Sequence, residues 1–330
     1  IAGPAHRDRI ERVRTAHRQA TTWAGQAVGR GLGAIGHGVA RVGARFADGR
    51  PVVEEPGAYQ AVSVLNGLYG DRLQQRHSPL SLPMALRAEG RDVPLSRGGL
   101  HAAYPHATGL VVVFIHGLVE TDDWWDIRSE RNWGHPGESY SRRLRAEGAW
   151  TPVRVRYNTG LRVSDNGQHL DDLLDALVAG WPVPVCGLVL VGHSMGGLVL
   201  HSALAQASSD RQWPSLVRVT VTIGTPHQGA AIVRGVARLT PVLARLPETR
   251  WLAEVISSRP AGMGDLGHGN LLADDWHDVD SGALDPGYPR PLREEFPGLE
   301  FERVDATLEL GRDTIFLFSG RRYVRFSLAQ

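Results

Sequence analysis

The sequence predicts an α/β protein with a mostly parallel β-sheet that has helices on both of its faces. Two observations lead to this prediction. From residue 109 onward, short apolar segments typical of strands alternate with longer segments that have the periodicity of amphipathic helices. The predicted strands are also nearly continuous apolar runs, such as GLVVVFI at 109–115, and strands buried on both faces of a sheet have this composition.

The composition is that of a globular protein. The chain has 330 residues, of which 42% are hydrophobic and 22% charged, and its formal net charge is +1. It contains no lysine, and its 36 basic residues are arginines scattered among acidic ones, so we expect no nucleic-acid partner. No segment reaches the roughly 18 consecutive apolar residues of a transmembrane span. The lone Cys186 cannot form an internal disulfide, which leaves the compartment open and favours a reducing, cytoplasmic one.

Residues 1–108 are predicted to form a helical N-terminal extension and a connection. Residues 5–48 have helical character, although the segment 25–43 is dense in glycine, which costs a helix about 1 kcal/mol per residue relative to alanine. A second helix is predicted at 57–76, and a segment rich in proline and glycine then leads to the first core strand. Because the chain begins at Ile1 and not at methionine, we expect a fragment or a processed chain.

Residues 109–276 are predicted to hold the α/β core. The predicted strands are 110–115, 152–157, 187–191 and 216–223, and the predicted helices are 137–147, 164–180 and 195–207. The helix at 164–180 has the clearest pattern, because its leucines recur at helical spacing. Residues 231–257 carry an apolar stripe, which fits either a lid over a binding site or an ordinary pair of packed helices.

The segment GHSMG at 192–196 lies between a predicted strand and a predicted helix. Packing gives no reason for glycines on both sides of a serine, but a sharp strand-to-helix turn needs positions without side chains. Such a turn exposes the serine hydroxyl at the N-terminus of a helix, where free N–H groups favour negative charge. A further glycine, Gly197, strengthens the pattern. We therefore predict that Ser194 is a nucleophile and not a structural turn residue.

Two other segments fall where such a site needs them. The first core strand ends in HGL at 116–118, the place expected for an oxyanion hole, so the N–H groups of Leu118 and Met195 are the predicted oxyanion donors. His116 is predicted to order this loop. The segment IGTPHQG follows the last predicted strand of the core, and His227 within it is predicted to be structural because it follows a sharp proline turn.

These motifs resemble those of the α/β-hydrolase superfamily, and within it the lipases and esterases related to the GPI inositol-deacylase group. The residues that carry the resemblance are FIHGL at 114–118, YNTGLRVSDNG at 157–167, LVGHSMGGL at 190–198 and TIGTPHQGA at 222–230. The resemblance implies a serine hydrolase that cleaves small-molecule or lipid esters through an acyl-enzyme. In it Ser194 would be the nucleophile and Leu118 and Met195 the oxyanion donors, with no metal or organic cofactor. Family members often insert a mobile lid where residues 231–257 lie.

The general base and the acid of this mechanism are not assigned from the sequence. In this superfamily an acid and then a histidine follow the serine. The histidines beyond residue 230 are His268 and His277, and both precede any later predicted strand, so neither is assigned. Asp305 and Asp313 have the order expected of the acid, but no histidine follows them.

Residues 279–330 are similar to one hemopexin-like repeat. The resemblance rests on a GYP linker, an FPGL turn, the Asp305-Ala306 pair and two short strands that end in FSG and YVRF. It implies a small all-β C-terminal segment that binds a protein partner. A single blade leaves its strand edges unpaired. The alternative is that the segments VDATLEL and DTIFLF supply further strands of the hydrolase sheet.

Three functional hypotheses follow from these patterns. The first is a serine esterase or lipase, which the motif at Ser194 favours. The second is a hydrolase-fold protein without turnover, whose hemopexin-like tail serves protein binding. The third is a truncated or fused product with little function of its own.

Overall fold

The computed structural model describes only part of the chain. The described residues are 56–126, 138–146, 148–227, 261, 262, 265, 271, 306–310, 314–319 and 322–327. The chain divides into two units, residues 1–65 and residues 66–330, and helix α2 (Pro56–Gln75) begins in the first and ends in the second. All the described strands belong to the second unit, which therefore holds the architecture described below.

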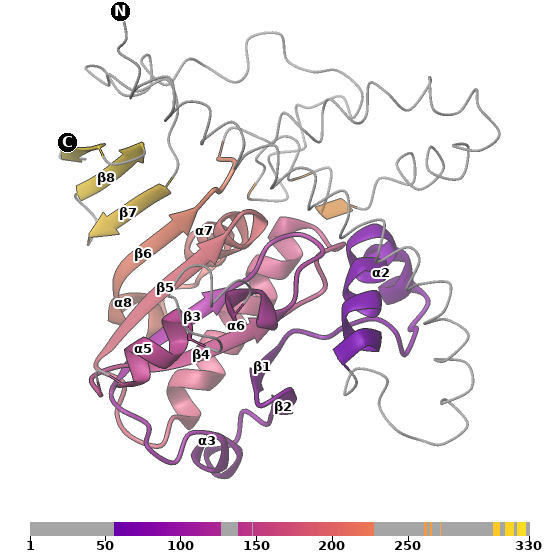
Figure 1. The fold of residues 1–330 in the computed structure, drawn as a ribbon, viewed down its shortest axis with the longest axis horizontal. Helices are drawn as coiled ribbons and strands as arrows, with labels where there is room; N and C mark the ends of the chain where they lie inside the picture. Colours follow the sequence, from indigo (N-terminus) through magenta and orange to yellow (C-terminus); the bar gives the residue numbers. More distant parts are fainter. Residues whose placement is uncertain are drawn as a thin grey trace, which may run out of the picture. The chain divides into compact units, whose positions relative to one another are not determined.

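The described strands form one nine-stranded sheet with the order β2-β1-β4-β3-β5-β6-β7-β8-β9 (Figure 1). Their bounds are β1 Ala85–Ala88, β2 Arg91–Val93, β3 Leu110–Ile115, β4 Thr151–Arg156, β5 Gly187–His193, β6 Val217–Ile223, β7 Ala306–Leu310, β8 Thr314–Ser319 and β9 Arg322–Ser327. The four central strands, β4, β3, β5 and β6, are parallel, and the pairs on either side of them are antiparallel. Most of the strands therefore run in one direction, which confirms the predicted mostly parallel sheet.

Helices cover both faces of the parallel strands. The described helices of this unit beyond α2 are α3 Arg97–Ala103, α5 Tyr140–Ala146, α6 Val163–Gly180, α7 Met195–Gln206, α8 Trp213–Leu216 and the 3-10 helix η3 Asp122–Asp126. Successive side chains of a strand point to opposite faces. Val111 and Val113 of β3 accordingly belong to the main core with α6 and α7, whereas Val112 and Phe114 pack with Trp125 of η3 on the other face.

Helix α6 shows how the sequence sets its bounds. Its buried stripe recurs at helical spacing and consists of Leu170, Leu173, Leu174 and Leu177. At its start, the carboxylate of Asp265 accepts a hydrogen bond from the Val163 N–H at 2.6 Å, and an acidic group is favourable at a helix N-terminus. The helix ends before Trp181, which precedes Pro182 and has the extended backbone that this position favours (φ −59°, ψ 140°).

The core strands and helices predicted between residues 110 and 223 are confirmed to within three residues at their ends. The predicted connection before residue 109 differs, because it contains β1, β2 and α3. Strands β1 and β2 form a hairpin whose two turn residues, Glu89 and Gly90, both have positive φ (50° and 75°). The sequence gives little sign of this hairpin, since its strands are short and carry charged residues.

Strands β7, β8 and β9 continue the sheet beyond β6 (Figure 1). Strand β7 pairs antiparallel with β6, with Val221 opposite Leu308 and Thr222 opposite Thr307, and the two threonine hydroxyls are hydrogen-bonded. In place of the expected separate all-β segment, β7 thus pairs with the edge that β6 would otherwise leave open, and β8 and β9 follow it in the same sheet. The alternative arrangement considered for VDATLEL and DTIFLF is the one observed, and the hemopexin-like repeat is not confirmed.

Several predictions concern residues outside the described ones. They are the helical character of 5–48, the lid at 231–257 and the residues His268, His277, Asp305 and Asp313. Among the helices that are described, none has both the length and the apolar character needed to cross a membrane.

Candidate active site

Ser194 occupies a sharp turn between β5 and α7. Its backbone lies in the positive-φ region (φ 52°, ψ −123°), which non-glycine residues adopt only under strain. The Ser194 N–H donates a hydrogen bond to the Ile223 carbonyl of β6 at 2.8 Å, and its carbonyl accepts one from the Gly197 N–H at 3.1 Å. The turn is therefore fixed on both sides, and its serine stands at the carboxyl end of β5, next to the first turn of α7.

The glycines of the motif are required by close backbone contacts. A Cβ atom on Gly192 would lie 2.6 Å from the Cα of Gly197. One on Gly196 would lie 2.5 Å from the carbonyl oxygens of both Ile115 and His116, at the end of β3. Carbon atoms do not approach backbone atoms this closely, so glycine at these positions lets α7 begin directly against the strands.

The loop after β3 lies against this serine. A Cβ atom on Gly117 would be 2.9 Å from the Cβ of Ser194. Val119 in the same loop has a positive φ of 58°, a conformation that costs on the order of 1–3 kcal/mol for a residue other than glycine. Its N–H donates to the Thr159 hydroxyl at 3.2 Å, which holds the strained residue in place.

The N–H groups of Leu118, in the loop after β3, and of Met195, the first residue of α7, have no hydrogen-bond partner among the described residues. The neighbouring N–H groups of Gly117 and Val119, in contrast, both have acceptors. The first N–H groups of a helix have no partner within it, which accounts for the unpartnered Met195 N–H.

His193, the residue before Ser194, is held by a carboxylate and an aromatic ring. Its Nδ1 lies 2.9 Å from Oε2 of Glu120. Its ring stacks on that of Trp124, with a centroid distance of 3.9 Å and an interplanar angle of 17°, and Trp125 meets it edge-on. Its Nδ1 is thus engaged by Glu120. Glu120 belongs to none of the predicted motifs, and its position three residues after Gly117, in the loop that follows β3, is the only signal that the sequence offers.

The other histidines near the carboxyl ends of the strands have structural surroundings. His116 is fully buried and stacks on Tyr157 at 4.6 Å, and burial lowers its pKa, so its ring is held neutral. His227 is exposed, with its Nε2 3.2 Å from the Thr222 hydroxyl and its ring against that of His201. Burial lowers the pKa of His201 to about 4.

No histidine of the described residues forms a hydrogen bond with the Ser194 hydroxyl. The structure therefore places Met195 directly after Ser194, and Leu118 directly after Gly117, which lies against Ser194, but the described residues supply no base or acid. Within the same residues, no group of His, Cys, Asp and Glu side chains has the arrangement of a metal site.

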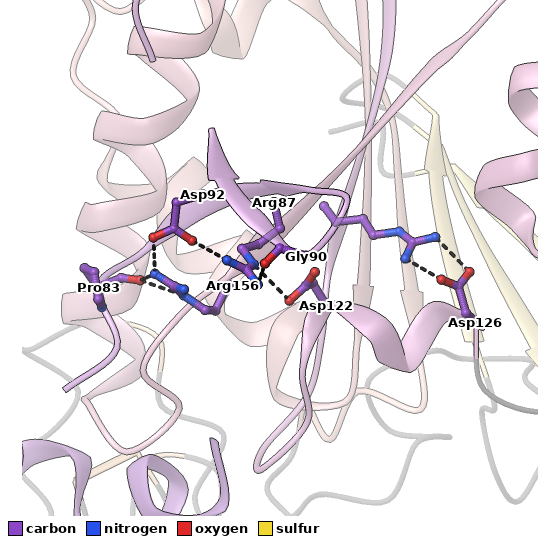
Figure 2. A network of polar contacts seen from close by, with 8 residues as sticks. Pro83, Arg87, Gly90, Asp92, Asp122, Asp126 and Arg156 are labelled. Atoms are coloured by element: carbon purple, nitrogen blue, oxygen red, sulfur yellow. Dashed lines mark hydrogen bonds and ion pairs between the residues drawn. The ribbon is translucent and has the colours of Figure 1, made fainter. Parts of the chain in front are cut away.

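Ion pairs of Arg87 and Arg156 connect the β1–β2 hairpin to β4 and to η3, the 3-10 helix that carries Trp124 (Figure 2). The side chains of Arg87 and Arg156 are almost fully buried and share the carboxylate of Asp92, at 2.6 and 2.7 Å. Arg87 also reaches Asp122 of η3 at 3.6 Å. Buried charges are tolerated only when they are paired. The β1–β2 hairpin is thereby connected to β4 and to η3. Asp122 and Arg156 lie far from this hairpin in the sequence, which contains no motif for the network.

A second ion pair fixes the end of η3. Arg154 of β4 donates two hydrogen bonds to the carboxylate of Asp126, at 2.6 and 2.8 Å. This pair is more exposed than the Arg87 pairs, so it contributes less to stability. Together the two sets of ion pairs anchor η3 at both of its ends.

The model of the PGAP1-like alpha/beta domain matches residues 170–253, which are 84 of the 330 residues. The match includes the turn at Ser194 and strand β6. Together with the sheet topology, it supports the α/β-hydrolase superfamily. No curated protein matches the sequence.

Solved structures with a similar arrangement are only distantly alike. Bacillus licheniformis lipase BlEst2 in its propeptide form is 19% identical with a TM-score of 0.36, over 56% of this chain and 33% of that one. The mature form is 19% identical with a TM-score of 0.35, over 59% of this chain and 65% of that one. A lipase-esterase related protein from Clostridium acetobutylicum is 10% identical with a TM-score of 0.29, over 52% of this chain and 70% of that one. The chain thus spans less than two thirds of either form of the first of these proteins.

Proposed function

We propose that this protein is a serine hydrolase that cleaves carboxylic esters through an acyl-enzyme, with Ser194 as the nucleophile. The observation that carries the proposal is the strained backbone of Ser194 at the carboxyl end of β5, beside two N–H groups without described partners. A serine held at positive φ between a strand and a helix points its hydroxyl away from the sheet. Packing gives no reason for this strain, whereas the exposure of a nucleophilic hydroxyl does.

The chemistry proceeds in two steps. The Ser194 hydroxyl oxygen attacks the ester carbonyl carbon as its proton passes to a general base, and the resulting oxyanion accepts hydrogen bonds from the N–H groups of Leu118 and Met195. The alcohol then leaves with a proton, and water hydrolyses the acyl-enzyme by the same route. We assign no residue to the base or to the acid. His268 and His277 follow Ser194 in the sequence and are the residues to substitute first.

The substrate that we propose is a small-molecule or lipid ester with an apolar acyl or alcohol group. Trp124, which is only partly buried, stacks on His193, the residue before Ser194. Aromatic rings of this kind favour apolar ligands over charged ones. No metal or organic cofactor enters the proposed reaction.

A fluorophosphonate probe tests the proposal, because it reacts with an activated serine and not with an ordinary one. We expect folded wild-type protein to be labelled, and both the S194A variant and heat-denatured wild-type protein to remain unlabelled. Circular dichroism establishes that the variant is folded. Folded wild-type protein that takes up no probe would contradict the proposal. That result would favour the second hypothesis, a hydrolase-fold protein without turnover that binds a protein partner.

A further inference from the structure

We infer that Glu120 is a positioning residue. It sets the distance between the loop after β3, which carries Leu118, and the turn that carries Ser194. This inference rests on the proposed function. One oxygen of its carboxylate, Oε2, accepts a hydrogen bond from the Gly117 N–H at 2.6 Å and lies 2.9 Å from Nδ1 of His193. Gly117 directly precedes Leu118, and His193 directly precedes Ser194. A single oxygen atom thus connects the residue before a proposed oxyanion donor to the residue before the proposed nucleophile.

The chemistry of the three groups suits this connection. An ionised carboxylate only accepts hydrogen bonds, so both partners must donate. The Gly117 N–H is a fixed donor, and His193 donates from Nδ1 when its proton is on that nitrogen. The carboxylate is 17% exposed and the imidazole 19% exposed, so both bonds are largely shielded from water and are stronger than surface bonds.

The neighbouring contacts fix both ends of the connection. The stacked ring of Trp124 restricts rotation of the His193 ring, which keeps Nδ1 directed at Glu120. At the other end, Gly117 has no room for a side chain, because a Cβ atom there would lie 3.0 Å from Oε2 of Glu120 and 3.2 Å from Nδ1 of His193. The three residues therefore fit together in one arrangement.

The strain in the loop explains why the carboxylate is needed. Val119 has a positive φ, and in the described structure its N–H is held by Thr159 alone. The turn that contains Leu118 is closed by the Glu120 N–H, which donates to the Gly117 carbonyl at 3.3 Å. If the carboxylate is removed, the strained turn can relax and carry the Leu118 N–H away from the oxyanion. The substrate in its ground state loses little, whereas the transition state loses a donor.

The test compares three variants with wild-type protein in the hydrolysis of p-nitrophenyl butyrate. We expect E120A to lower kcat by about 10- to 100-fold with KM changed less than threefold, since losing one oxyanion donor outright costs about 10²–10³-fold. E120Q keeps an acceptor for the Gly117 N–H, so we expect a smaller loss. E89A is the matched control: it removes a carboxylate from an exposed glutamate in the β1–β2 turn that contacts neither Gly117 nor His193, and we expect its kcat to equal that of the wild type.

An alkyl trifluoromethyl ketone provides a readout that a merely structural role would not change. The ketone adds to the serine and places a negatively charged oxygen in the oxyanion hole, so its inhibition constant should rise in E120A in proportion to the fall in kcat/KM. If E120A does not fold, H193F removes the same connection from its other end and keeps an aromatic ring against Trp124. We expect H193F to lower kcat and inhibitor affinity together.

The possible failures are distinguishable. Active wild-type protein with unchanged kcat and inhibitor affinity in E120A, or in H193F where E120A is unfolded, would overturn the inference and leave the proposed function standing. Wild-type protein that neither hydrolyses the ester nor reacts with a fluorophosphonate would overturn both. A loss in E120A that appears only in KM would also contradict the inference, because it would mean that Glu120 affects substrate binding and not the transition state.

Discussion

Gly196 leaves no room for a side chain where α7 begins against β3. A Cβ atom at this position would lie 2.5 Å from two backbone carbonyl oxygens, which cannot move without shifting the strand. We therefore expect G196A to lower the free energy of unfolding by about 1–3 kcal/mol, the usual cost of overpacking a core. Urea denaturation monitored by circular dichroism measures this change.

Gly98 is the matched control for that substitution. It lies in helix α3, and a Cβ atom there would meet no atom within 4 Å. Because alanine favours a helix by up to about 1 kcal/mol over glycine, G98A should be neutral or stabilising. Equal stability of G196A and G98A would mean that α7 does not approach β3 as closely as described.

Single residues of the candidate site differ in how well the sequence predicts them. Ser194 and its glycines can be predicted because strain and close approach demand particular residue types at fixed spacing. Glu120 could not be predicted, because a carboxylate three residues after a glycine is not a characteristic sequence pattern. Its role depends on the position of His193, which is 73 residues away in the sequence.

At the scale of elements, the pairing of β6 with β7 depends on two threonines that face each other. Thr222 and Thr307 are both buried, and their hydroxyl groups are hydrogen-bonded across the strands. We expect T222V and T307V each to lower the free energy of unfolding by about 1–2 kcal/mol, since each leaves a buried hydroxyl without this partner. The loss of unfolding free energy in the double variant should be smaller than the sum of the two single losses, by about 1 kcal/mol.

This double-mutant cycle also decides between the two interpretations of residues 279–330. If β7 extends the sheet, the two threonines are energetically coupled. Strictly additive effects would mean that β7 does not pair with β6, and a separate C-terminal segment such as a hemopexin-like repeat would then be favoured. Equilibrium unfolding of the four proteins in urea provides the free energies.

Elements were predictable where burial alone determines the sequence. The parallel strands β3 and β5 are apolar runs because both of their faces are covered, and α6 has its leucines on one stripe. The β1–β2 hairpin was missed because its stability comes from ion pairs with β4 and η3 and not from an apolar pattern. Such pairs join residues that only the fold brings together.

At the scale of the whole molecule, the predicted arrangement of a parallel sheet between helices follows from the order of elements along the chain. Alternation of strands with helices favours parallel pairing, as β4, β3, β5 and β6 show, and the carboxyl ends of β3 and β5 then meet at one edge of the sheet. That edge is where Ser194 and the loop after β3 lie. The sequence could not show that β7 to β9 would extend the same sheet, because short amphipathic strands suit a separate blade equally well.

The folded molecule should lose stability in acid because the surroundings of two imidazoles, the buried His116 and the half-buried His201, disfavour their charged form. Burial lowers the pKa of His116 and His201 below the usual value of about 6.5, and to about 4 for His201. As the pH falls below about 6.5, the unfolded chain binds a proton at His201 that the folded protein does not bind until about pH 4. The free energy of unfolding therefore decreases across this range, by up to about 3 kcal/mol from His201.

Substitution of His201 isolates this contribution from that of the carboxylates, which also titrate in acid. We expect the fall in unfolding free energy between pH 7 and pH 4.5 to be smaller in H201Q than in wild-type protein by about 2–3 kcal/mol. The comparison concerns the change with pH, so a constant difference in stability between the two proteins does not affect it. H106Q alters an exposed histidine and should keep the wild-type dependence. A pH dependence in H201Q equal to that of the wild type would show that His201 is protonated as readily in the folded protein as in the unfolded chain, and hence that its surroundings do not disfavour the charged ring.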